Sequence, residues 1–148
     1  MKLVYDVAHN IAKIEKHKIN GEERKVVVHR KGATRAFPAN REEVPAKYRD
    51  LGQPVLIPGS MGTASWILLG QPNSMNLSFG STAHGAGRTM SRSKARRNFK
   101  EDEVKKSLNE KGIFIKALTR DGVVEETPQA YKDVDSVVSV SQIGRAHV

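Results

Sequence analysis

The sequence predicts an α+β domain that is rich in strands, and three observations point to it. Short runs of β-branched and aromatic residues outnumber helical patterns along the chain. Most glycines lie between these runs, where they fit loops. The 148 residues are one domain's worth of sequence, or a piece of something larger, and 38% apolar residues can build a modest core. Together these features favour a mixed, sheet-rich arrangement with a few helices.

In the N-terminal part, β-branched and aromatic residues predict a strand at residues 2–7. Residues 9–16 fit either a short helix or an extended continuation. Asn20-Gly21 is a strong turn signal. The next segment, residues 24–30, is expected to be a buried strand because it contains Val26-Val27-Val28.

A short helix is expected after Pro38, where Asn40 and Glu43 form a capping box. Pro45 would still fit the first turn of that helix. Three apolar strands should follow, the first of them ended by Pro58-Gly59. They are expected at residues 54–57, 64–69 and 75–79.

Toward the C-terminus, residues 91–97 are expected to be helical. Residues 100–110 give the clearest helical pattern, because acids stand early, lysines follow, and Gly112 provides a stop. Residues 113–118 should return as a strand.

The charge balance indicates a polyanionic partner, because the formal net charge is +9 and the isoelectric point is about 9.9. Cysteine is absent, which excludes a disulfide framework. Polar residues follow Met1 too soon for a secretory signal, and the apolar run at residues 64–69 is too short to cross a bilayer. We expect a cytoplasmic protein without a membrane partner.

The most informative segment is residues 79–88, in which His84 stands among glycines, alanines and small hydroxyl residues. Such neighbours leave the imidazole open to a bulky phosphate, and glycines let backbone N–H groups turn toward it. Arg88 can add a bidentate contact. The pattern indicates a histidine that attacks phosphorus or grips a phosphoryl group, with an ordinary tight turn as the alternative.

A run of basic residues follows His84, with no acid among them. It consists of Arg88, Arg92, Lys94, Arg96, Arg97 and Lys100. On a helix, Arg88, Arg92 and Arg96 would share one face. Such a face beside a phosphate-binding turn indicates a nucleic-acid backbone as ligand, whereas a solvated basic face is the plain alternative.

Three other segments leave their role open. Residues 58–65 form a small-residue loop that can hold phosphates, but they match neither a Walker A loop nor a nucleophile elbow, and an ordinary connection explains them equally well. Residues 29–35 are a basic turn that fits phosphate contacts or solvent. His9 follows Asp6 by three residues and can ligate a metal, but one histidine alone makes no metal site.

Taken together, these segments resemble the RtcB family of RNA-splicing ligases. The similarity runs from about residue 2 to residue 140, in several blocks of fixed order. The blocks are residues 5–13 (YDVAHNIAK), 29–38 (HRKGATRAFP), 52–65 (GQPVLIPGSMGTAS), 81–88 (STAHGAGR) and 129–135 (QAYKDVD).

The resemblance implies an enzyme that joins RNA with a 2′,3′-cyclic phosphate or 3′-phosphate end to RNA with a 5′-hydroxyl end. Such ligases act in tRNA splicing and RNA repair and use GTP and Mn²⁺. By resemblance, His84 is the nucleophile that carries GMP, His9 is a manganese ligand, and Arg88 and Arg92 hold RNA phosphate. The guanylate-binding positions would be Asn10, Pro58, Gly59, Ser60, Met61, Ser65, Gly85, Ala86 and Gly87.

The chain also departs from the family pattern. The family's other metal ligands, an Asp, a Cys and further His residues, match no position here, and a nucleotide-binding lysine would lie past Val148. Residues 1–142 are therefore expected to be the C-terminal part of an RtcB-like ligase domain with an incomplete fold. Residues 143–148 are expected to be a non-native tail, because a common sequencing adapter encodes them.

Two other functions remain open at this point. A basic RNA-binding module without catalysis agrees with the composition. A phosphohydrolase that uses His84 would release phosphate without joining RNA ends. The RNA substrate, whether tRNA halves or broken RNA, does not follow from the sequence.

Overall fold

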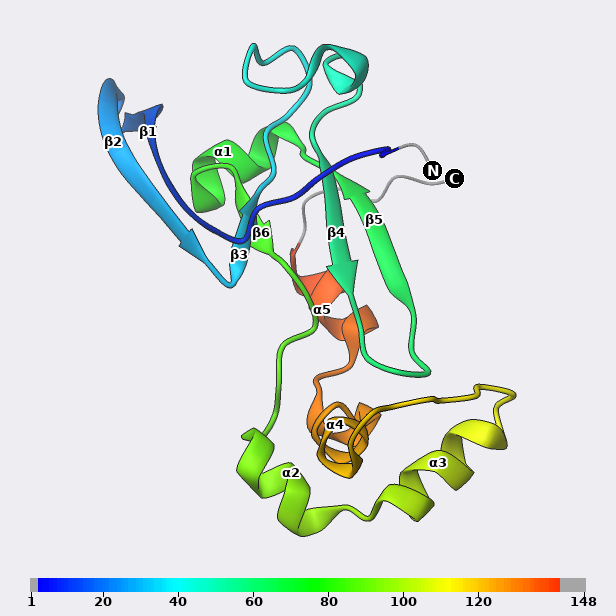
Figure 1. Ribbon diagram of the computed structural model, residues 1–148. Helices are drawn as coiled ribbons and strands as arrows, with labels where there is room; N and C mark the ends of the chain where they lie inside the picture. Colours follow the sequence, from blue (N-terminus) through cyan, green and yellow to red (C-terminus); the bar gives the residue numbers. More distant parts are fainter. Residues whose placement is uncertain (1–2, 142–148) are drawn as a thin grey trace.

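The computed structural model describes residues 3–141, so the start of the strand expected at residues 2–7, and the expected tail at 143–148, lie outside the described residues. Within residues 3–141, six strands form three two-stranded antiparallel sheets, β1–β2, β3–β6 and β4–β5, and most of the short helices follow them in sequence (Figure 1). The strands are β1 (Asn10–Ile19), β2 (Glu22–Lys31), β3 (Ala33–Arg35), β4 (Pro54–Pro58), β5 (Ser65–Leu69) and β6 (Ser81–Ala83). The helices are α1 (Pro72–Ser78), α2 (Arg92–Asn98), α3 (Glu101–Asn109), α4 (Arg120–Glu125) and α5 (Val134–Ser141), with 3-10 turns η1 (Ala46–Tyr48) and η2 (Pro128–Ala130). The predicted mixed α+β class is confirmed at this level.

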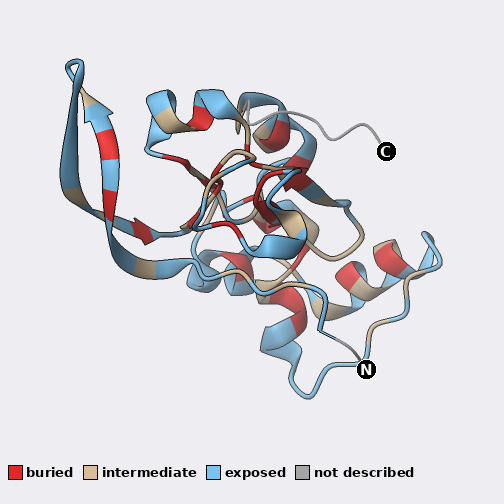
Figure 2. Cartoon of the chain, turned by 90° about the horizontal axis from the view of Figure 1, so that it is seen from above, coloured by how far each residue is buried: buried red, intermediate tan, exposed pale blue. Residues whose placement is uncertain are grey.

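The β1–β2 hairpin confirms the predicted turn and the extended alternative for residues 9–16. Asn20 and Gly21 have φ values of 52° and 90°, which suit a tight two-residue hairpin turn. The strand predicted at residues 24–30 is confirmed as part of β2, but its predicted burial is wrong, because the outer face of the ribbon is not covered by a second layer among the described residues. Most of the hairpin is exposed (Figure 2). Val27 and its cross-strand partner Ile14 are 68% and 73% exposed.

The main apolar core lies where the β4–β5 pair meets α5. Val55, Ile57 and Leu68 are buried there, and α5 adds Val134 and Val138. Ala86, just past β6, packs into the same cluster. The segment around His84 is therefore attached to the central strands by burial of a neighbouring side chain.

A second apolar cluster joins α3 to α4, at the end of the molecule where α2, α3 and α4 gather (Figure 1). Its buried residues are Val104, Leu108 and Val123. Met61, from the loop between β4 and β5, packs against it. This contact ties the loop at residues 59–64 to the helices.

Two predicted strands are absent from the structure. Residues 3–7 and 113–117 form no ladder because no strand of the described chain lies beside them to accept their hydrogen bonds. Ile113 and Ile115 nevertheless pack against the α3 cluster, while Phe114 between them is 87% exposed. The residue types that favour a strand do not by themselves supply a partner.

The predicted helix after Asn40 and the strand expected at residues 75–79 are also wrong. Asn40 has φ 64°, which is not the conformation of a helix N-cap, and Glu43 pairs with Arg41. Only the 3-10 turn η1 forms nearby. Residues 75–78 belong to helix α1, which begins at Pro72, a residue that suits the first helical turn.

The remaining element predictions are confirmed within a residue or two. Strands expected at 54–57 and 64–69 are β4 and β5, and helices expected at 91–97 and 100–110 are α2 and α3. Ser91 caps α2 by accepting a hydrogen bond from the Lys94 N–H. No helix among residues 3–141 is long and apolar enough to cross a membrane.

Replacing Gly70 by alanine is expected to destabilise the fold by about 2–3 kcal/mol. A Cβ at this position would lie 2.2 Å from the Phe37 carbonyl oxygen and 2.5 Å from the Ala36 carbonyl carbon, and backbone atoms cannot turn aside. Urea unfolding of the 148-residue chain measures the loss. Gly112→Ala is the control, since a Cβ there meets nothing within 4 Å and only its positive φ of 73° is strained, at about 1 kcal/mol.

Candidate functional site

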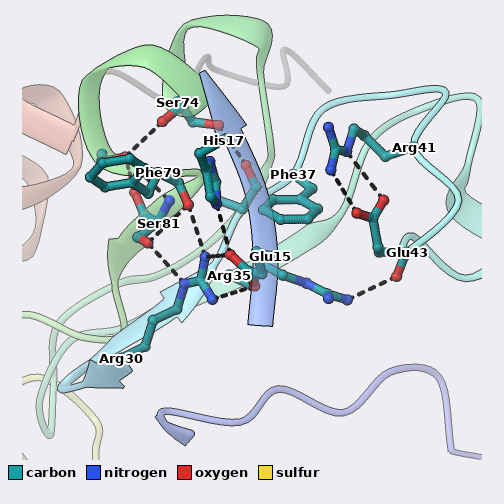
Figure 3. A network of polar contacts seen from close by, with 12 residues as sticks. Glu15, His17, Arg30, Arg35, Phe37, Arg41, Glu43, Ser74, Phe79 and Ser81 are labelled. Carbon is teal, nitrogen blue, oxygen red and sulfur yellow. Dashed lines mark hydrogen bonds and ion pairs between the residues drawn. The ribbon is translucent and has the colours of Figure 1, made fainter. Parts of the chain in front are cut away.

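A buried ion pair fastens the β1–β2 hairpin to the strand that leads to His84 (Figure 3). Arg30 on β2 donates to both carboxylate oxygens of Glu15 on β1, at 2.7 and 2.8 Å. The same guanidinium donates to the Ser81 hydroxyl and to the Phe79 carbonyl oxygen, each at 2.8 Å. Arg30 is 2% exposed, so the charge-assisted bonds act with little competition from water.

His17 completes this buried group. Its Nε2 lies 3.0 Å from Glu15, and since a carboxylate can only accept, Nε2 carries the proton. Burial alone would raise the pKa of Glu15, but hydrogen bonds from Arg30 and His17 and the Arg30 charge outweigh it and hold this pKa below its usual range. The carboxylate is therefore charged at neutral pH, and it holds β1, β2 and the start of β6 in one arrangement.

This arrangement brings His9 and His84 together. Their rings stack with centroids 4.6 Å apart and planes inclined by 22°. His9 lies just before β1 and accepts a hydrogen bond at its carbonyl oxygen from Gly32 N–H, at 3.0 Å. A Cβ on Gly32 would lie 3.8 Å from the His84 ring, so glycine here leaves space beside the imidazole. Both histidines are exposed, and the ring pair is open to a ligand.

The loop after β4 meets the segment after His84. Pro58 accepts a hydrogen bond at its carbonyl oxygen from Ala86 N–H, at 3.0 Å. A Cβ on Gly85 would lie 3.3 Å from that same oxygen. Ser65 stands opposite Pro58 in the β4–β5 register, so the two predicted small-residue segments converge.

Side chains of the loop at residues 59–64 form hydrogen bonds within the loop or pack against the apolar core. Ser60 N–H donates to the Thr63 hydroxyl at 2.7 Å, and Thr63 N–H and its hydroxyl both reach the Ser60 carbonyl oxygen. A Cβ on Gly59 would collide with Thr63 Oγ1 at 2.3 Å, which explains glycine at this position. The Met61 side chain packs against the second apolar cluster, between α3 and α4, so only its backbone is available to a ligand.

Arg88 and Arg92, the predicted phosphate ligands, are engaged by acids of the chain itself. Arg88 Nη1 lies 3.4 Å from Glu126, and Arg92 Nε lies 3.4 Å from Glu125. Tyr131 forms a backbone bridge with Arg88 and lies under its guanidinium, 4.8 Å from the ring centroid. The structure thus brings the predicted site residues into two groups, one around His84 and one around these acids.

The chain is similar to known proteins over almost its whole length. Residues 1–147 match the family described as "tRNA-splicing ligase RtcB". The chain belongs to the RtcB family. Relatives include proteins named tRNA-splicing ligase RtcB from Nanoarchaeum equitans, 57% identical over 141 residues, and from Thermococcus kodakarensis, 58% identical over 140 residues. A third, from Pyrobaculum aerophilum, is 55% identical over 149 residues.

The match covers nearly all of this chain but a minor part of each RtcB relative. It takes in 95%, 95% and 99% of this chain, against 30%, 29% and 31% of the three relatives. Activity described for a whole RtcB protein therefore comes to this chain only as a proposal.

The donors present do not by themselves fit a Mn²⁺ site of the kind that the RtcB resemblance implies. His9 and His84 contribute imidazoles, but no group of three or more His, Cys, Asp or Glu residues gathers among residues 3–141. A stable site for such an ion usually has more protein or substrate ligands than two stacked rings provide.

Sequence reasoning missed three participants. Gly32 lines the space beside His84, and no local pattern distinguished it from other turn glycines. Glu125 and Glu126 pair with Arg88, Arg92 and Arg96 of the basic run, and their only signal was an acidic pair well separated from it in sequence. Their roles arise from the packing of α4 against α2 and α3, which a single sequence does not reveal.

Proposed function

We propose that this chain forms the nucleotide-transfer portion of a GTP- and Mn²⁺-dependent ligase that joins 3′-phosphate or 2′,3′-cyclic phosphate RNA ends to 5′-hydroxyl ends. The observation that carries the proposal is the exposed His9–His84 pair, with Gly32 leaving space beside the rings. Membership of the RtcB family supports it.

His84 would act as the nucleophile in the first step. A ring nitrogen attacks the α-phosphate of GTP, so a nitrogen–phosphorus bond forms while the bond to pyrophosphate breaks. GMP then passes to the 3′-phosphate of one RNA, and the 5′-hydroxyl of the other RNA displaces it. Two transfers replace one difficult displacement, which is the advantage of a covalent intermediate.

Other residues near His84 would hold the nucleotide. Asn10 follows His9 at the start of β1. Ser65 and the backbone of residues 58–61 and 85–87 lie on the segments that converge around Pro58 and Ala86. Charge on the triphosphate would be neutralised by Mn²⁺ bound to His9 together with donors outside this chain. Arg88 and Arg92 would take RNA phosphate once their acidic partners release them.

We also infer that the three small sheets belong to larger sheets of the RtcB fold. Ile14 and Val27 are exposed and stand opposite each other on the hairpin, so they form a small apolar face that a further layer could cover. The chain spans about 30% of its relatives, so further polypeptide is present in them to cover such faces.

The test uses a chimaera in which this chain replaces the matching region of the Thermococcus kodakarensis relative. Incubation with α-labelled GTP and Mn²⁺ should leave an acid-labile label, and mass spectrometry should place GMP on His84. Joining of a 3′-phosphate RNA to a 5′-hydroxyl RNA should follow. Lack of an adduct would overturn the proposal, and phosphate release without joining would indicate the phosphohydrolase instead.

The 148-residue chain alone is expected neither to ligate RNA nor to bind Mn²⁺ tightly. The reason is the incomplete donor set described above. Ligation assays and Mn²⁺ titration on the isolated chain measure this directly. Robust joining of RNA ends by these residues alone would contradict the expectation.

A non-catalytic RNA-binding module is the second candidate, favoured by the net charge of +9. Such a module would take no label from GTP. Its affinity for RNA would fall steadily with salt, because binding would consist of phosphate contacts that release counterions. Labelling of the chimaera therefore separates the two functions.

A further inference from the structure

The basic run after His84 is folded onto carboxylates, which limits what it can bind. We call Arg88, Arg92 and Arg96 the arginine row, and Glu125 and Glu126 the acidic pair. Arg92 Nε lies 3.4 Å from Glu125 and 3.6 Å from Glu126, and Arg96 Nη1 forms a close ion pair with Glu125. Every member of the row thus has a carboxylate partner.

Arg88 is the most heavily engaged member of the row. It donates to the carbonyl oxygens of Met90 and Glu125, at 3.0 and 2.6 Å, and to the Tyr131 hydroxyl at 3.0 Å. Tyr131 in turn donates to Glu126 in a close hydrogen bond. Desolvation of the hydroxyl, followed by the neighbouring Glu126, raises the pKa of Tyr131, so the phenol keeps its proton and the bridge stays intact at neutral pH.

These contacts are partly shielded from water. The shielding is greatest at Arg88 and Glu125, whose side chains are 21% and 16% exposed, whereas those of Arg92, Arg96 and Glu126 are 64%, 42% and 41% exposed. Charge-assisted hydrogen bonds in such surroundings are stronger than those of exposed ion pairs. A phosphate that binds the row has to compete with these carboxylates.

Because the acidic pair competes for the arginine row, the row binds phosphates of higher charge in preference to those of lower charge. A phosphate monoester at an RNA end carries a charge of about −1.5 to −2 at pH 7 and three strong acceptor oxygens. An internal phosphodiester carries a single negative charge on two free oxygens, which is about what a carboxylate already offers. The monoester can therefore displace the acidic pair, whereas the diester gains little by exchange.

We propose that Glu125 and Glu126 are specificity-determining residues: by competing for the arginine row, they make it select terminal phosphate over internal RNA backbone. This rests on the proposed function, since it assigns RNA phosphate to the row, and it adds how internal phosphates are excluded. The acids themselves do not touch the reacting atoms.

The test compares two RNA oligonucleotides of one sequence, ending in 3′-phosphate or 3′-hydroxyl, by fluorescence anisotropy on the 148-residue chain. The wild-type chain should bind the 3′-phosphate RNA at least about fivefold more tightly. In the double variant Glu125→Gln with Glu126→Gln, affinity for the 3′-hydroxyl RNA should rise about tenfold, as expected when two competing charges are removed. The preference for 3′-phosphate should fall below about twofold.

The matched control is the double variant Glu101→Gln with Glu103→Gln. It changes the net charge equally, but these acids pair with Lys105 and Lys100 on the surface of α3. It should strengthen binding of both RNAs by the same small factor and keep the preference. The single variants Glu125→Gln and Glu126→Gln decide the matter should the double variant fail to fold by circular dichroism.

The inference is overturned if the Glu125 and Glu126 variants keep the wild-type preference for 3′-phosphate RNA. It is also overturned if the Glu101 and Glu103 control gains as much affinity for the 3′-hydroxyl RNA as they do. Absence of RNA binding by the wild-type chain and by every Gln variant overturns it too. Labelling of His84 by GTP is measured separately on the chimaera. A labelled His84 with an unchanged preference would therefore refute the role of the acidic pair and leave the proposed ligase intact.

Discussion

Replacement of Glu15 by glutamine is expected to lower the free energy of unfolding by about 3–5 kcal/mol. Glutamine keeps the shape of the side chain but removes the charge that two guanidinium N–H groups of Arg30 meet at 2.7 and 2.8 Å. Arg30 is 2% exposed and would remain as a buried cation without a counter-ion. Urea unfolding of the 148-residue chain, followed by circular dichroism, measures the change.

Glu22→Gln is the matched control, since it removes the same charge from the same hairpin. Glu22 pairs with Arg24 at 2.9 Å, but the two side chains are 72% and 58% exposed. Exposed pairs contribute little, so the control should change stability by less than about 1 kcal/mol. A loss for Glu15→Gln that is no larger than that of the control would show that the buried pair does not hold the hairpin in place.

The same pair predicts how stability depends on pH. The folded-state pKa of Glu15 is lowered because the hydrogen bonds from Arg30 and His17 outweigh the burial that opposes them. Its contribution is therefore fully present above the unfolded pKa, near 4.3, and is lost as pH falls through the lower folded pKa. The difference between wild type and Glu15→Gln should shrink below about pH 4 and stay constant between pH 6 and 8.

The elements that could be predicted from the sequence are those with strong local signals. Asn20-Gly21 placed the hairpin, and the acid-to-lysine order with Gly112 placed α3, because turn geometry and helix ends depend on nearby residues. The failures at residues 3–7 and 113–117 have the opposite cause. Extended chain becomes a strand only when a partner lies beside it, and partners are set by tertiary packing.

The candidate site likewise has features that could be predicted from the sequence and features that could not. Small residues around His84 indicated an open imidazole, and the structure shows an exposed ring stacked on His9. The basic run suggested one free cationic face, yet Glu125 and Glu126 meet its arginines from a helix far along the chain. Only Arg92 and Arg96 lie on helix α2, since Arg88 precedes it in a backbone bridge with Tyr131. Charge spacing along one segment does not predict what packs against it.

Three histidine variants of the chimaera should separate the roles of the stacked rings. His84→Ala is expected to abolish the GMP adduct completely, because no other group can take the phosphoryl bond at that position. His9→Ala leaves the nucleophile but removes its stacking partner and an imidazole that can ligate Mn²⁺, so labelling should slow by about 10²-fold or more. Rates of label incorporation from GTP, measured over a range of Mn²⁺ concentrations, distinguish the two.

His29→Ala is the matched control, because it removes an exposed imidazole from β2, where His29 pairs in register with Ala12 on the ribbon. Its labelling rate should stay within about twofold of wild type, since a substitution away from the reacting group removes no interaction made in the transition state. Added Mn²⁺ should partly restore His9→Ala and leave His84→Ala without label, as a lost ligand weakens metal binding whereas a lost nucleophile leaves nothing for the phosphoryl group to join. Equal loss in all three variants would instead mean that the substitutions act through the fold, and His84 would no longer be the residue that carries GMP.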